Sequence, residues 1–137
     1  MAIKSIQSSV GRATTRKSKI FLFEFGLGPQ PVFVTVNDET VRAPLPFNCT
    51  FKRWTFNCAS VPIGADAVVD IFLDGVSIFD TANSNKAVFP AGGSGLYAGT
   101  SFKTLTGMRD QLMHGVVLMS GGSTIAKGIV VSLEFEP

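Results

Sequence analysis

The sequence is poor in the residues that most often carry out chemistry in proteins. Its 137 residues include one histidine, two cysteines, one tryptophan and one tyrosine, and only 16% are charged. His114 has neither a second histidine nor a Cys-x-x-Cys pair to join it, which argues against a zinc site. The P-loop glycine signature is absent, and Gly93-Ser94-Gly95 is only a fragment of the hydrolase nucleophile motif. We therefore expect no catalytic residue, no metal, no cofactor and no small-molecule substrate.

Long hydrophobic runs are also missing. The first apolar stretch, residues 20–25, is short and contains Glu24, whereas a membrane span needs about 20 apolar residues. The basic residues near the N-terminus are not followed by the run of about 7–15 apolar residues that a signal peptide requires. We expect a soluble chain that is not exported by this route and has no membrane partner.

The two cysteines do not predict a disulfide. Cys49 and Cys58 lie nine residues apart in a stretch with the pattern of an extended strand. On a continuous strand their Cα atoms would be about 30 Å apart, whereas a disulfide requires less than about 7 Å. We expect two buried, reduced thiols.

What the chain does contain points to β-sheet. Hydrophobic residues make up 45% of it, with twelve Phe, fourteen Gly and seven Pro. This composition excludes a wholly disordered chain and is typical of strands separated by many turns. No stretch has the spacing of an amphipathic helix of three turns. Apolar alternation predicts eight or nine short strands, with candidates at residues 20–25, 32–36, 47–59, 67–73, 76–80, 101–105, 115–119 and 128–135. The prediction is one all-β domain over residues 20–137, a sandwich or barrel.

Three local patterns sharpen this prediction. Pro44 and Pro46 argue against regular strand pairing just before residue 47. Between residues 47 and 59 the apolar side chains change parity, which indicates a bulge near Lys52 and Arg53. An Asp-Gly pair at 74–75 separates two alternating runs and predicts a two-residue hairpin turn. The hairpin face expected in the core carries Val69, Ile71, Leu73, Val76 and Ile78, and the other face carries Asp70, Phe72 and Phe79.

Four aspartates cluster around this hairpin: Asp66, Asp70, Asp74 and Asp80. Such a cluster could form a calcium site or a pair of glycosidase carboxylates. However, Asp74 belongs to the turn, Asp66 precedes the first strand, and Asp70 would lie across from Phe79. We favour solvated charges that protect a sheet edge from aggregation, with a calcium site between loops as the alternative.

The N-terminal segment differs from the rest in charge. Residues 1–20 hold five basic and no acidic side chains, whereas residues 21–137 hold seven basic and ten acidic ones. Residues 1–19 have no strand or helix periodicity, so we interpret them as an extended basic arm. The arm could contact phosphates of nucleic acid, but its interleaved apolar residues favour a protein partner. A tail without function is the third interpretation. The candidate partner-binding residues are Ile3, Lys4, Ile6, Val10, Arg12, Arg16, Lys17 and Lys19.

From about residue 34 onward, several short motifs follow one another in a definite order. They are residues 43–50 (APLPFNCT), 61–65 (VPIGA), 69–79 (VDIFLDGVSIF), 90–92 (PAG) and 122–131 (GSTIAKGIVV). In this order they resemble a domain that recurs in the virion proteins of tailed bacteriophages, in both heads and tails. The resemblance covers about 100 residues, excludes residues 1–31, and has Asp74 where Asn is common. It implies an antiparallel β-sandwich of about eight strands, often jelly-roll-like, used as a building or decorating module without catalytic residues.

With this resemblance, we expect a capsid decoration (cement) protein on the capsid surface of a virion assembled in the host cytoplasm. It would form a homotrimer, bind the major capsid protein and bridge capsomers, with the arm lashing neighbouring subunits. Contacts between copies would cover the second apolar face of the hairpin, with Phe72 and Phe79. The alternative is a tail-fibre or baseplate module that binds host glycans through Tyr97, placed in a glycine-rich loop at residues 90–100. Trp54 is expected in the core, and an enzyme is the least favoured class.

Overall fold

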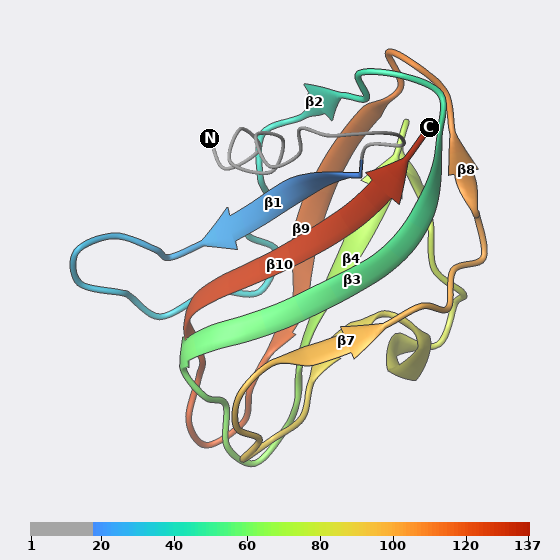
Figure 1. Ribbon diagram of the computed structural model, residues 1–137. Helices are drawn as coiled ribbons and strands as arrows, with labels where there is room; N and C mark the ends of the chain where they lie inside the picture. Colours follow the sequence, from blue (N-terminus) through green and yellow to red (C-terminus); the bar gives the residue numbers. More distant parts are fainter. Residues whose placement is uncertain (1–17) are drawn as a thin grey trace.

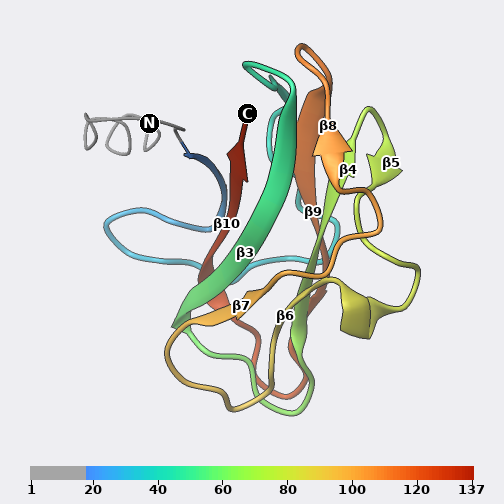
Figure 2. The same cartoon turned by 45° about the vertical axis from the view of Figure 1, so that its right-hand side comes forward.

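The computed structural model describes residues 18–137, which form two antiparallel five-stranded sheets packed face to face (Figures 1 and 2). The first sheet contains β1 (Lys19–Phe25), β10 (Lys127–Glu136), β3 (Cys49–Ser60), β7 (Tyr97–Gly99) and β8 (Thr106–Gly107). The second contains β2 (Ala43–Pro44), β9 (Leu112–Ser120), β4 (Ala67–Leu73), β5 (Val76–Ser77) and β6 (Ala87–Phe89). A 3-10 turn, η1 (Asn83–Asn85), lies between β5 and β6. The predicted all-β sandwich is confirmed.

The strand order is that of a jelly roll. The first sheet runs β1-β10-β3-β7, with β8 pairing another part of β3, and the second runs β2-β9-β4-β5, with β6 pairing another part of β4. Trp54 pairs with Leu133 on one side and Gly99 on the other, so β7 continues the sheet beyond β3. The pieces β5 with β6, and β7 with β8, therefore each occupy one strand position. The result is eight positions in two sheets, as in a double Greek key.

The core between the sheets is unusually aromatic. The largest fully buried side chains include Phe56, Phe79, Phe89 and Phe135. The β3 bulge makes this possible, because Glu134 pairs with Arg53 and Phe135 with Phe51, which leaves Lys52 as an extra residue. Side chains of odd parity before the bulge and of even parity after it consequently face the same core, as predicted.

The Asp-Gly hairpin forms as predicted, but it is shorter than expected. Asp74 and Gly75 have φ values of 50° and 83°, the positive values that a tight two-residue turn requires, and Leu73 pairs with Val76. Alternation stops at the end of β5, since the Ser77 hydroxyl accepts a hydrogen bond from the Phe79 amide at 3.1 Å. Two face assignments were therefore wrong: Val76 is exposed at the hairpin tip, and Phe79 turns inward into the core.

The remaining differences concern short elements. Residues 32–36 form only one isolated bridge, from Phe33 to Lys127, and residues 101–105 are not a strand. Strands β6 and β8 were not predicted, and Pro44 pairs with Leu112 although the two prolines argued against regular pairing there. Pro44 is tolerated because β2 is an edge strand of its sheet.

Candidate assembly surfaces

The structure shows where the first described strand begins. Lys19 is the first residue of β1 and pairs with Phe135, so it belongs to the sheet and not to the arm, which corrects the predicted boundary. β1 therefore begins beside the end of β10, close to the C-terminus (Figure 1). The other candidate arm residues lie outside the described residues: Ile3, Lys4, Ile6, Val10, Arg12, Arg16 and Lys17.

Tyr97 is part of strand β7 and not of a loop, which corrects its predicted location. Its ring is half-buried and meets Phe89 edge-on, with centroids 4.8 Å apart. Its hydroxyl accepts a hydrogen bond from the Ser94 amide at 3.1 Å. Tyr97 therefore packs against the edge of the core. Its role in glycan binding stays a prediction. Trp54 is buried, as expected.

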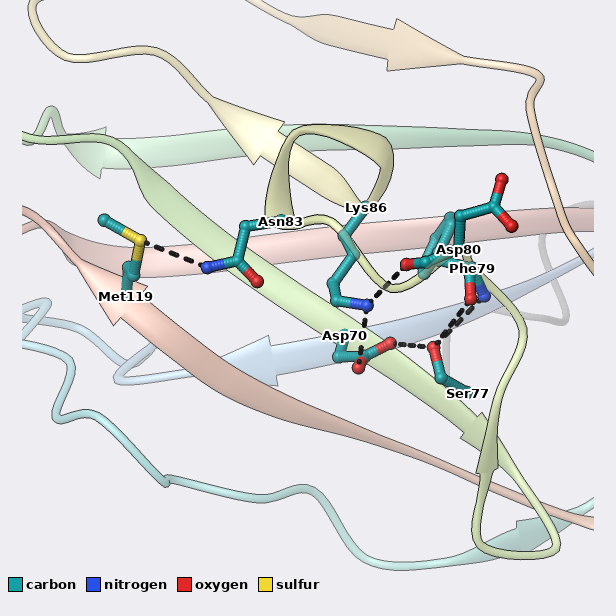
Figure 3. A network of polar contacts seen from close by, with 7 residues as sticks. All are labelled: Asp70, Ser77, Phe79, Asp80, Asn83, Lys86 and Met119. Carbon is teal, nitrogen blue, oxygen red and sulfur yellow. Dashed lines mark hydrogen bonds and ion pairs between the residues drawn. The ribbon is translucent and has the colours of Figure 1, made fainter.

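A buried polar network replaces the solvated carboxylate predicted at position 70 (Figure 3). Asp70 is only 4% exposed, and its Oδ2 lies 3.5 Å from Lys86 Nζ, which also donates to the Asp80 carbonyl at 2.8 Å. Ser77 Oγ donates to Asp70 Oδ1. Asn83, in η1, contacts Met119 on β9. These contacts fix the segment that follows β5 across the outer face of the second sheet.

Two of the other hairpin aspartates have structural partners too, whereas Asp80 is exposed and contributes only its backbone carbonyl to the network. Asp66 accepts a hydrogen bond from the Ala91 amide at 2.9 Å, and Asp74 accepts one from the Leu112 amide at 2.9 Å. Among residues 18–137, no group of three or more His, Cys, Asp or Glu side chains could hold a metal ion. In the same range, no helix is long and apolar enough to cross a membrane.

The part of the second sheet that this segment leaves open carries two stacked rings. Phe72 on β4 pairs with His114 on β9, and their ring centroids are 5.2 Å apart. His114 is buried, with Nε2 3.7 Å from Glu39 Oε1 and no hydrogen-bond partner for Nδ1 among the described residues. Phe72 is only half-buried. It thus remains on the outer face where we predicted a contact between copies, whereas Phe79 does not.

The connection from β1 to β2 forms a second candidate contact surface. It projects from the body in two views (Figures 1 and 2). A hydrogen bond from the Val32 amide to the Gly26 carbonyl, at 3.0 Å, closes its base. Its exposed apolar side chains are Leu27, Val32, Phe33, Val36 and Val41. Lys127 Nζ lies 4.6 Å from the Phe33 ring centroid, which holds one of these side chains in place.

Both cysteines are free thiols on the same strand, β3, as expected. Cys49 is buried and Cys58 half-buried. Burial raises the pKa of Cys49, and it raises the pKa of Cys58 to about 12. Neither thiol is therefore a candidate nucleophile at neutral pH.

We expect disulfide exchange at Cys58 with an aromatic disulfide reagent to be at least about thirtyfold slower in the folded protein than in the unfolded chain. The thiolate is roughly a thousandfold scarcer, and the greater nucleophilicity of a thiolate of higher pKa offsets only part of this loss. Stopped-flow labelling at pH 8, with and without denaturant and with Cys49→Ser to isolate the signal, measures the ratio. Equal rates in the two states would contradict the assignment.

Comparisons with known proteins add a likeness of fold. No family model matches the chain, and no curated protein matches it. A chain in the structure of the cyanophage Pam1 capsid asymmetric unit aligns with a TM-score of 0.54 and 11% identity, over 92% of this chain and 89% of that one. Chains of infectious bursal disease virus align less well, with TM-scores of 0.38 (Gt strain, 12% identity) and 0.40 (Gx strain, 15% identity). These alignments cover 88% and 90% of this chain but 33% of each viral chain.

Proposed function

We propose that this chain is a structural protein of a bacteriophage virion, a decoration or cement protein on the capsid surface. The observation that supports it best is the fold. One jelly roll accounts for the described residues, and it aligns over nearly the whole length of a chain from a cyanophage capsid assembly. Because the alignment covers 92% of this chain and 89% of that one, nearly all of both chains takes part in the likeness.

The surfaces of the body fit a protein that works by contact. Three of the four carboxylates around the hairpin, those of Asp66, Asp70 and Asp74, hold turns and a covering segment in place. Apolar side chains are instead exposed on the projecting β1–β2 connection, and the half-buried Phe72 lies on the outer face of the second sheet. Exposed apolar surface of this kind is typical of protein interfaces.

In this proposal the body sits on the capsid and the arm ties it to its neighbours. The major capsid protein is the main partner, and the protein itself forms a homotrimer over a gap between capsomers. Each arm adds one weak contact to a neighbouring subunit. Stability of the shell comes from many copies whose bodies and arms act together.

The deciding experiment is the number of copies of this chain in purified virions. Quantitative mass spectrometry, with peptides of the major capsid protein as internal standard, is expected to give hundreds of copies per particle. A dozen copies or fewer would overturn the capsid assignment and favour the alternative, a tail-fibre or baseplate module binding host glycans. Absence of the chain from particles would overturn both.

A further inference from the structure

The two sheets have four edges, and one of them differs from the rest. The edges formed by β5 with β6 and by β7 with β8 consist of pieces of two or three residues. The edge at β2 is two residues long and contains a proline. Within residues 18–137, only β1 presents a continuous edge, of seven residues. Short, interrupted or proline-bearing edges resist pairing with another chain, whereas a long continuous one invites it.

The exposed edge of β1 has no partner among residues 18–137, where β10 is its only paired neighbour. Its charged residues, Lys19 and Glu24, lie near its ends, and residues 20–23 between them are all apolar. The pairing with β10 is regular along the whole strand, with no bulge to twist the edge away. The edge therefore lacks the features that usually prevent strand addition.

Side chains on β1 alternate between the two faces of the sheet. Phe23 and Phe25 point into the core, so Ile20, Leu22 and Glu24 line the outer face. A strand added here would be favoured by an apolar residue against Leu22 and a basic residue against Glu24, both on its own outer face. Cross-strand pairs of this kind stabilise antiparallel sheets.

We propose that residues 3–9 of a second copy add to β1 as an antiparallel strand. In this register Lys4 faces Glu24 and Ile6 faces Leu22, both on the outer face, and Ser8 faces Ile20. The spacing of Lys4 and Ile6 matches that of Glu24 and Leu22 only when the strands run in opposite directions. The inference rests on the proposed function in one respect, because it assigns the docking place of the lashing arm.

A second copy is the better source of this strand than the same chain. Pairing within one chain would force residues 10–18 to reverse direction, and that stretch contains no Asn-Gly, Asp-Gly or Pro-Gly turn. The reversal would also gather Arg12, Arg16 and Lys17 in a single loop, where they repel one another. Extended, the same nine residues span about 30 Å and can reach a neighbouring body.

Disulfide trapping between two single-cysteine variants tests the proposal. Full-length Ile6→Cys and isotope-labelled Leu22→Cys proteins, both carrying Cys49→Ser and Cys58→Ser, are mixed and oxidised. We expect a mixed disulfide dimer at least tenfold more abundant than in a matched mixture of Ile6→Cys with Lys52→Cys, which lies on strand β3 of the same sheet. Yields equal to this control would overturn the proposal.

A double variant, Ile6→Cys with Leu22→Cys in one chain, separates the two sources of the strand. Exchange between copies gives covalent dimers and larger species on a non-reducing gel. A disulfide formed only within single chains would overturn exchange. All of these measurements use purified protein in solution, so a negative result would leave the virion copy number, and with it the proposed function, unaffected.

Discussion

Replacing Lys86 with methionine is expected to lower the free energy of unfolding by about 3–5 kcal/mol. Asp70 and Lys86 are both buried, and the lysine also binds the Asp80 carbonyl. Without the ammonium group, the Asp70 carboxylate keeps only the Ser77 hydroxyl as a side-chain partner among the described residues and stays buried as an uncompensated charge. Urea denaturation followed by tryptophan fluorescence measures the change, because Trp54 lies in the core.

Two further variants separate the ion pair from simple loss of packing. Asp70→Asn combined with Lys86→Met removes both charges, so it is expected to recover at least half of the loss. Lys103→Met, at an exposed position, should leave the midpoint of denaturation nearly unchanged. If the double variant were as unstable as Lys86→Met alone, the buried charge would not be the cause.

Deleting residues 1–17 is expected to weaken binding to capsids that lack this protein by about a hundredfold, the scale on which a second tethered contact raises affinity. Ser18 and the whole of β1 remain, so the body should keep its denaturation midpoint. Co-sedimentation with such capsids over a range of protein concentrations gives the affinity. Unchanged binding would remove the arm from the mechanism.

The residues responsible within the arm can be separated by a matched pair of variants. Arg12→Gln, Arg16→Gln and Lys17→Gln remove charge, whereas Ile3→Ser, Ile6→Ser and Val10→Ser remove the apolar anchors. If the arm binds protein as proposed, the second set should lose more affinity than the first. The remaining binding should become insensitive to salt only in the variant that replaces the three basic residues with glutamine.

The structural features that were predicted correctly are determined by residues that lie close together in the sequence. The parity change around Lys52 required a bulge whichever strand paired there, and the Asp74-Gly75 turn required positive φ values whatever packed against it. The strand patterns alone did not distinguish a sandwich from a barrel. The resemblance to phage virion domains predicted a sandwich of jelly-roll character.

The structural features that could not be predicted from the sequence depend on contacts between segments that are distant in the chain. Alternation put Asp70 on a solvent face, but Lys86 returns across that face after η1 and covers it. Tyr97 lies in a glycine-rich stretch that becomes a strand only because β3 offers its free side. Pieces of two or three residues, such as β6 and β8, have too little periodicity to be recognised without the strand they pair with.

The pairing of β1 with β10 joins the first described strand to the last. During synthesis, β1 has no partner until β10 has left the ribosome, so the first sheet can be completed only after translation of the body has finished. Such long-range closure makes folding slow. It also delays the ordering of the β1 edge. A nascent chain therefore cannot pair this edge with another chain before its own core has formed.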